Sequence, residues 1–172
     1  MEKSVFELLM KYNKETNITM NAIISALSED EWNKQSGGYF KSIHELCSHI
    51  FYADYTWLNR FKSFNIFESL KDEYFNKDYD YKDVLFRDIK EYTDSRTELD
   101  AVMANFIKEL TTDDLDREMK WNNNRTGDSF QKTIGVCLSH VFNHEAHHRG
   151  MISLYLELLG KENDFSNLYV YG

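Results

Sequence analysis

The sequence predicts an all-α protein, a four-helix bundle with up-down-down-up topology. Its 172 residues include no proline and 7 glycines, so few positions would interrupt a long helix. Four stretches carry apolar residues at the three- and four-residue spacing of an amphipathic helix. The connection between the second and third stretches is long enough to let both helices run in the same direction.

The first predicted helix runs from about Ser4 to Leu27. One stripe along this segment consists of Val5, Leu9, Tyr12, Thr16, Ile23 and Leu27. A capping box at Ser28–Glu31 then begins a short helical turn. Gly37 and Gly38 end that turn, because consecutive glycines favour a loop.

A second capping box, Ser42–Glu45, begins the next predicted helix, which extends to about Phe64. Its apolar stripe consists of Leu46, Ile50, Ala53, Trp57 and Phe61. The third predicted helix spans about Lys82 to Leu110. Its seam alternates steps of four and three through Leu85, Ile89, Tyr92, Arg96, Leu99, Met103, Phe106 and Leu110.

The fourth predicted helix spans about Thr133 to Leu159. Thr133 suits the N-cap, and Gly160 stands where a left-handed residue ends a helix. Roughly 17 residues, Asn65–Tyr81, form the crossover, whereas antiparallel neighbours usually need about 2–8. In the 111–132 connection, alternating residues flank the Asn/Gly-rich stretch Asn122–Gly127, so we expect a small β-ribbon before the last helix. We expect one domain over residues 1–172.

Composition and charge exclude several classes of protein. Acidic residues outnumber basic ones by 29 to 20, the net charge is −9, and the pI is near 5.1, which argues against a nucleic-acid binder. No apolar stretch approaches the ~20 residues of a membrane span. The first residues form no apolar signal segment, and Cys47 and Cys137 are too few for a disulfide framework. We therefore expect a soluble, cytoplasmic protein that binds neither nucleic acid nor membranes.

The strongest chemical signal lies in the fourth predicted helix, which holds His140, His144, His147 and His148. His144 and His148 are one turn apart and about 40° apart around the axis, so both imidazoles can aim at one point. A helix holds a transition metal with such a pair. His140 and His144 form an equivalent pair, and spacing alone leaves both open. His140 and His148 lie about 12 Å apart along the axis, too far to share an ion easily.

A third ligand would have to come from another helix. His49 is the best candidate, because it borders the apolar stripe of the second predicted helix, one turn from Leu46 and from Ala53. His44 lies in the first turn of that helix, where we expect it to be exposed. The alternative is that these histidines form a polar face without a metal.

The segment Leu138–Ser153, LSHVFNHEAHHRGMIS, followed by Leu158-Leu159-Gly160, resembles the C-terminal signature of the DinB family. Ser42–Ile50, SIHELCSHI, is similar to the second-helix motif of that family and lies at the expected separation. The resemblance covers essentially the whole chain. It departs from the common pattern at Met151, where a glutamine often follows His-Arg-Gly, and this bears on the surroundings of the site.

The resemblance implies an up-down-down-up bundle with a divalent metal held by His49, His144 and His148, with His140 and His147 beside the site. It also places the chain in a superfamily with mycothiol-dependent maleylpyruvate isomerases, in which a metal activates a low-molecular-weight thiol. Imidazole ligands suit zinc, nickel, iron and copper alike, and of these we expect zinc or nickel, with iron as a further candidate. The habits of relatives and the aromatic-rich helices favour a homodimer.

Three neutral imidazoles leave at least one coordination position for water or substrate. We therefore expect a metal-dependent enzyme that activates a small thiol or water, for transfer to a small molecule or for its hydrolysis. One alternative is a non-catalytic metal-holding protein of the stress response or another binding function. The other is a structural dimer whose histidines are incidental.

Three further residues could bear on the site: Arg96, Glu145 and Cys137. Arg96 occupies a seam position where leucine is expected: it would contact an anionic substrate, or extend to solvent, or pair with a buried acid. Glu145 adjoins His144 but points about 100° away, so we do not expect a general base there. Cys137 lies two turns from His144, roughly 10 Å, so we expect both cysteines to be small core residues and not ligands.

Overall fold

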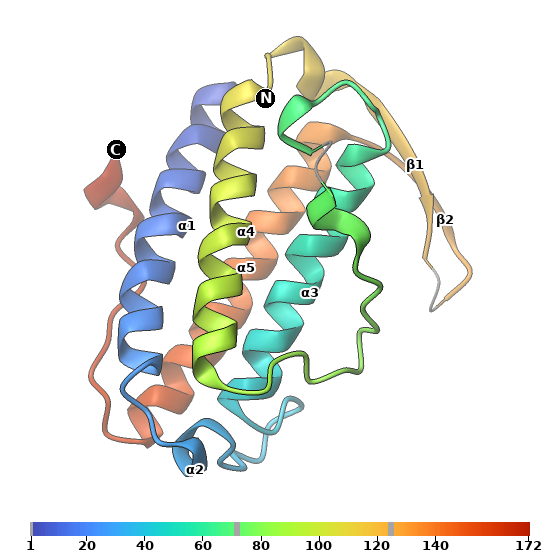
Figure 1. Ribbon diagram of the computed structural model, residues 1–172. Helices are drawn as coiled ribbons and strands as arrows, with labels where there is room; N and C mark the ends of the chain where they lie inside the picture. Colours follow the sequence, from blue (N-terminus) through green and yellow to red (C-terminus); the bar gives the residue numbers. More distant parts are fainter. Residues whose placement is uncertain (1, 71–72, 124–125) are drawn as a thin grey trace.

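The computed structural model describes residues 2–70, 73–123 and 126–172. Four long helices lie side by side in a bundle (Figure 1): α1 (Lys3–Ile24), α3 (Ile43–Lys62), α4 (Ile89–Glu109) and α5 (Ile134–Leu158). A one-turn helix, α2 (Glu29–Trp32), lies between α1 and α3. Short 3-10 helices occupy Glu68–Leu70, Glu73–Asn76, Asp113–Asp116 and Leu168–Tyr171. Parts of the predicted crossover and of the Asn/Gly-rich turn, residues 71–72 and 124–125, lie outside the described residues.

The predicted up-down-down-up topology is confirmed. In Figure 1, α1 and α5 run in one direction and α3 and α4 in the other. The strongest packing joins antiparallel pairs, α3 with α5 and α1 with α4, whereas the parallel pairs α3–α4 and α1–α5 touch less. The segment between α3 and α4 returns along the outside of the bundle, which is what makes these neighbours parallel (Figure 1).

The helix ends follow the capping signals closely. At α2, the Ser28 side chain accepts from the Glu31 backbone and the Glu31 side chain accepts from the Ser28 backbone, as a capping box requires. Ser42 caps α3, but the Glu45 carboxylate accepts from the Lys41 amide instead, so this second box is incomplete.

The last helix begins and ends as expected. Thr133 caps the start of α5, and Gly160 adopts a φ of 73° after the C-cap residue Leu159.

One helix start was predicted wrongly. α4 begins at Ile89, not near Lys82, because the Asp88 side chain caps it by accepting a 2.8 Å hydrogen bond from the Glu91 amide. The residues between Lys82 and Asp88 continue the crossover instead of a helix.

Long-range contacts hold that last part of the crossover in its non-helical path. The Leu85 amide donates a 3.1 Å hydrogen bond to Oγ of Ser48 on α3. Phe86 is buried, with its ring centroid 5.1 Å from that of Phe51 and 5.3 Å from that of Tyr92. The apolar periodicity of this segment therefore reflects burial against α3, and Leu85 is not part of a helical seam.

The expected β-ribbon is present. β1 (Glu118–Asn122) and β2 (Ser129–Thr133) pair antiparallel, in a register that places Glu118 opposite Thr133 and Asn122 opposite Ser129. The hairpin extends along the outside of the bundle next to α3 (Figure 1). Trp121 of β1 contacts Trp57 of α3 with ring centroids 5.3 Å apart, so the ribbon forms a wall next to the α3–α5 surface.

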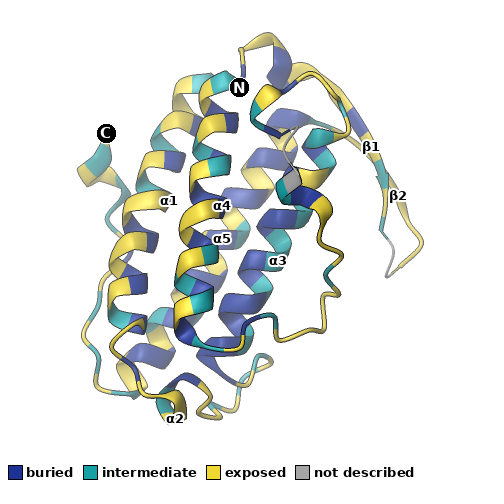
Figure 2. Cartoon of the chain, in the orientation of Figure 1, coloured by how far each residue is buried: buried dark blue, intermediate teal, exposed yellow. Residues whose placement is uncertain are grey.

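The buried faces of the four long helices turn toward one another (Figure 2). Cys47 and Cys137 are free and buried there, as predicted. The interior also holds polar side chains: Asn13, Thr16, Asn17, Asn21, Asp54, Arg96, Asp100, Glu145 and Arg149. Within the described part of the chain, no helix has both the length and the apolar character to cross a bilayer.

Candidate metal centre

Three histidines from two antiparallel helices converge on one point. α3 contributes His49, and α5 contributes His144 and His148, which lie one turn apart. One ring nitrogen from each can be chosen so that all three lie within 4.8 Å of one another. The Nε2 atoms of His49 and His144 are 3.1 Å apart, and the His144 and His148 ring centroids are 4.3 Å apart. These are the three residues that the family resemblance implies as ligands.

The other histidines of α5 border this group without joining it. His140 lies one turn from His144, with ring centroids 5.8 Å apart, but its ring also packs against Trp57 at 5.3 Å. His147 is exposed, with its ring 4.8 Å from that of His148. Of the two pairs that spacing left open, the fold therefore places His144 with His148 opposite His49.

His44 is not exposed, contrary to the expectation for a first-turn residue. It is 8% exposed, and its ring stacks on Trp32 with centroids 4.7 Å apart. Its Nδ1 lies 2.9 Å from Oδ1 of Asn33. The short α2 segment folds back over the start of α3, and this tertiary contact covers a position that an isolated helix would expose.

Burial keeps the three clustered imidazoles neutral. Loss of solvent, followed by repulsion from His148 and His49, lowers the pKa of His144 to about 3. Burial and then repulsion from His49 lower the pKa of His148 to about 4. Burial also lowers the pKa of His49, against an opposing effect of Asp54. Neutral imidazole is the form that binds a metal, so the donor set fits a divalent transition metal.

An aromatic residue from the loop before α3 lies against the cluster. The Phe40 ring centroid is 4.5 Å from that of His49 and 5.4 Å from that of His148. The Tyr155 hydroxyl fixes this loop by donating a 2.7 Å hydrogen bond to the Phe40 carbonyl. Phe40 therefore shields one side of the histidines with apolar surface, which strengthens electrostatic interactions there.

A second set of aromatic residues borders the cluster on the side of the β-ribbon. Trp57 lies between His140 and Trp121, at ring distances of 5.3 Å each. The Arg60 guanidinium lies 4.5 Å from the Trp57 ring and 5.7 Å from the Trp121 ring. Burial lowers the pKa of Arg60, and Tyr52 and Cys137 act in the opposite direction. Sequence reasoning did not find this group, because Trp121 reaches Trp57 only through the fold of the ribbon.

Arg96 is 1% exposed and meets two acids. Its Nη1 donates to Asp54 at 2.6 Å, and its Nη2 donates to Asp100 at 2.7 Å. Asp100 also accepts two 3.1 Å hydrogen bonds from the Asn17 amide. The observed arrangement is thus the pairing with buried acids; a contact with an anionic substrate stays a prediction.

Glu145 points into the same polar interior and is 1% exposed. It accepts a 2.9 Å hydrogen bond from Asn13. Burial, followed by the adjacent Asp54 carboxylate, raises the pKa of Glu145 well above its usual range. Within the described residues, no carboxylate or thiol belongs to the three-histidine group. The expectation that Glu145 lies away from the ligands therefore agrees with its position.

Comparisons with known proteins bear on the family and the fold of this chain. The model of the DinB family matches residues 1–170. A DinB-like protein from Bacillus subtilis, YjoA, is 18% identical, with a TM-score of 0.62 over 90% of this chain and 94% of that chain. YfiT from Bacillus subtilis is 16% identical, with a TM-score of 0.68 over 94% of this chain and 91% of its own. YfiT is described as a probable metal-dependent hydrolase with an unusual four-helix bundle topology. Among curated protein sequences, none matches this chain.

Proposed function

This chain belongs to the DinB family, and we propose that it is a metal-dependent enzyme that activates a small thiol or water to act on a small molecule. The reaction would be transfer of the thiol or hydrolysis by the water. One observation carries this proposal: three neutral imidazoles converge without a fourth protein ligand in the described residues. A three-ligand set is typical of catalytic metal sites, whereas structural sites use four protein ligands.

His49, His144 and His148 are the residues that would hold the metal; we propose zinc or nickel, with iron as a further candidate among the metals that suit imidazole donors. A divalent ion at this position supplies Lewis acidity, which lowers the pKa of a water or thiol and polarises a carbonyl. The protein contributes the neutral state of the three rings, because their burial disfavours the imidazolium form.

Side chains around the histidines would shape the substrate site. Phe40 restricts solvent on one side, and the wall formed by Trp57, Trp121 and His140 offers flat apolar surface next to His144. Arg60, half-buried against this wall, would attract an anionic group of a small thiol or substrate. These features favour a small molecule with a planar or apolar part and a negative charge.

The likeness to YfiT supports the hydrolytic version of the proposal, because that protein is described as a probable metal-dependent hydrolase. The site itself favours the thiol version. Hydrolysis commonly uses a carboxylate base, and the buried carboxyls of Glu145 and Asp54 are committed to hydrogen bonds in the polar interior. A thiol needs no such base once its pKa is lowered. The absence of a carboxylate from the histidine group, within the described residues, equally suits a protein that holds metal without turnover.

Substitution of cobalt for the native ion distinguishes these possibilities. A small anionic thiol, 3-mercaptopropionate, should produce a sulfur-to-cobalt charge-transfer band in the cobalt protein. The band should be lost in His144→Ala and retained in Cys137→Ala, since Cys137 is buried in another part of α5. If no thiol alters the spectrum and the cobalt shell is filled by protein atoms, the enzyme proposal fails and the metal-holding function is supported.

A further inference from the structure

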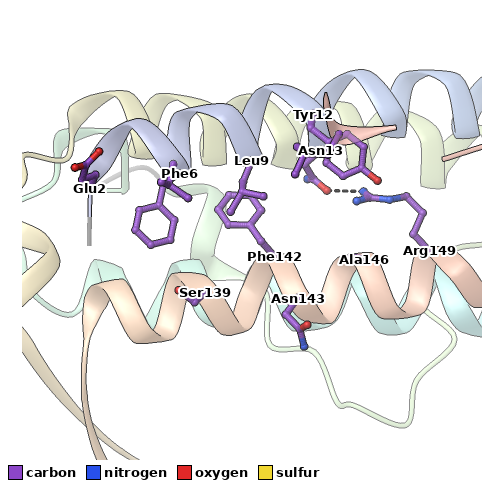
Figure 3. Close-up of a pocket in the computed structure, with 12 residues that line it drawn as sticks. Glu2, Phe6, Leu9, Tyr12, Asn13, Ser139, Phe142, Asn143, Ala146 and Arg149 are labelled. Atoms are coloured by element: carbon purple, nitrogen blue, oxygen red, sulfur yellow. Dashed lines mark hydrogen bonds between the residues drawn. The ribbon is translucent and has the colours of Figure 1, made fainter. Parts of the chain in front are cut away.

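A second cleft lies between α1 and α5, on a different side of α5 from the three histidines. It has a volume of about 610 Å³, within the range of about 300–1,000 Å³ that is usual for small-molecule sites. α1 and α5 run parallel there, and the side chains that line the cleft come from both helices (Figure 3). On α5 they include Ser139, Phe142, Ala146 and Arg149, a stripe that excludes His144 and His148. The cleft is therefore distinct from the candidate metal centre.

The walls of the cleft are apolar along most of its length. The apolar side chains that line it are Val5, Phe6, Leu9, Phe142, Ala146 and Leu168. Leu168 belongs to the C-terminal 3-10 helix, which packs against α1 and closes one side. Arg149 lies 10 residues after Ser139, a rise of about 15 Å along α5, so the cleft is long enough for an extended aliphatic chain.

Arg149 supplies a positive charge at one end of this apolar cleft. Arg149 is buried, with only 4% of its surface exposed, and its side chain points toward α1 (Figure 3). Nη1 donates to Oδ1 of Asn13 at 2.5 Å and to Oδ1 of Asn17 at 3.3 Å. The guanidinium carbon lies 5.0 Å from the centre of the Tyr12 ring.

No acid among the described residues bonds directly to Arg149. Its two hydrogen-bond acceptors among the described residues are neutral amides, and they occupy only Nη1. Glu145, which acts on Arg149 electrostatically, is linked to it through Asn13. Nε and Nη2 form no hydrogen bond to a described residue, so these donors are available to an acceptor in the cleft.

The opposite end of the cleft carries the other sign of charge. Glu2 lines this end of the cleft, and Arg149 lines the other (Figure 3). A negative group is therefore favoured next to Arg149 and disfavoured near Glu2. Together with the apolar walls between them, this polarity defines both the chemistry and the orientation of a ligand.

We propose that the α1–α5 cleft binds an organic monocarboxylate with an extended apolar body, its carboxylate on Arg149 and its chain directed along Phe142 and Leu9. The guanidinium would pair with the carboxylate through Nε and Nη2, the planar arrangement that arginine uses for carboxylates. Because this cleft and the three histidines use different faces of α5, ligand binding here does not require the proposed catalytic activity.

Isothermal titration of the metal-loaded protein with decanoate and with decan-1-ol tests this proposal. The two probes share an apolar chain and differ in charge. Decanoate should bind at least about tenfold more tightly than decan-1-ol, since a charge-assisted hydrogen-bonded pair contributes that much. Arg149→Gln should remove this preference and leave the binding of decan-1-ol nearly unchanged.

A blocking variant keeps the test valid if Arg149→Gln does not fold. Ala146→Phe places a ring in the cleft from an exposed position of α5, and both probes should lose at least about tenfold in affinity. Ala101→Phe makes the same change at an exposed position of α4 and should have no effect.

Three results would overturn the proposal. The first is that the wild type binds both probes with equal affinity, and the second is that decanoate still binds to Ala146→Phe with the wild-type affinity. The third is that the wild type is a dimer that binds neither probe, and that Ala146→Phe dissociates this dimer. The last would show that a second copy of the chain covers the cleft.

Discussion

The Nε2 atoms of His49 and His144 lie 3.1 Å apart, although 95 residues separate them in the sequence. Two nitrogens bound to one tetrahedral zinc, at about 2.0–2.1 Å each, would lie about 3.3 Å from each other. Packing of α3 against α5 therefore holds these rings at a separation that suits a shared ion. His148, one turn along α5, completes the group.

Replacement of His49 by alanine should remove the metal, whereas replacement of His44 should not. We expect about one divalent ion per chain in the wild type and a loss of affinity by orders of magnitude in His49→Ala, because two imidazoles bind a metal much more weakly than three. His44→Ala should retain the ion, since its ring stacks on Trp32, away from the group. Elemental analysis of the purified variants measures this. Retention of metal in His49→Ala would contradict the assignment.

His44→Ala should nevertheless destabilise the protein by about 1–3 kcal/mol. The variant loses the buried ring stacked on Trp32 and its hydrogen bond with Asn33. Urea denaturation measures the change in the free energy of unfolding. His147→Ala, at an exposed position of α5, is the control and should unfold like the wild type. Equal stability of the two variants would show that the His44 contacts contribute nothing.

In the metal-free protein, His144 should make stability fall as the pH falls. Its pKa is about 3 in the folded state and near 6.5 in the unfolded chain, so the unfolded state binds more protons between these values. Below about pH 6.5 the free energy of unfolding therefore decreases toward acid. Glu145 and Asp100, whose pKa values are raised, act in the opposite direction, because their protonation favours the folded state.

Comparison of two metal-free proteins isolates this effect. The melting temperature of His144→Ala should fall less than that of the wild type between about pH 7 and pH 5, because Glu145 and Asp100 are common to both. An equal or steeper fall in the variant would show that His144 is not held neutral by burial.

Arg96→Met should destabilise the protein by about 3–5 kcal/mol. Removal of one partner leaves Asp54 and Asp100 buried without a counter-charge. Lys90→Met, which breaks the exposed pair with Asp94 on the same helix, is the control and should cost little. Chemical denaturation of both variants measures the difference. If Arg96→Met is as stable as Lys90→Met, Arg96 has no structural role and its predicted contact with a substrate gains support.

Gly38→Ala should destabilise the loop that carries Phe40. A Cβ at this position would lie 2.1 Å from the Tyr155 hydroxyl oxygen, so Tyr155 must move and lose its hydrogen bond to the Phe40 carbonyl. We expect a cost of about 1–3 kcal/mol. The metal should also bind more weakly, since Phe40 packs on His49.

A double-mutant cycle tests the cause. In a Tyr155→Phe background the clashing oxygen is absent, so Gly38→Ala should cost clearly less than in the wild type. Strictly additive costs in thermal denaturation would exclude the clash as the origin of the effect.

Features that depend on neighbours within one helix or turn could be predicted from the sequence. The His144–His148 pair is one, because four residues always return to nearly the same face of a helix. The caps at Ser28 and Thr133 are others, since a cap bonds to an amide three residues away. The bundle itself followed from four amphipathic segments and one long crossover. The choice of His49 over His44 came from the apolar stripe of a single helix and from the family resemblance.

Features that depend on which segments meet were decided only by the tertiary structure. α4 starts at Ile89, because Leu85 and Phe86 are held against α3, and their apolar spacing alone looked helical. His44 is buried because α2 folds over it, and Arg96 pairs with Asp54 of another helix. Periodicity tells which side of a helix is apolar, but not which groups lie opposite. The groups that lie opposite a helix depend on the packing of elements that are far apart in the chain. The surroundings of Glu145 and the cleft at Arg149 have the same origin.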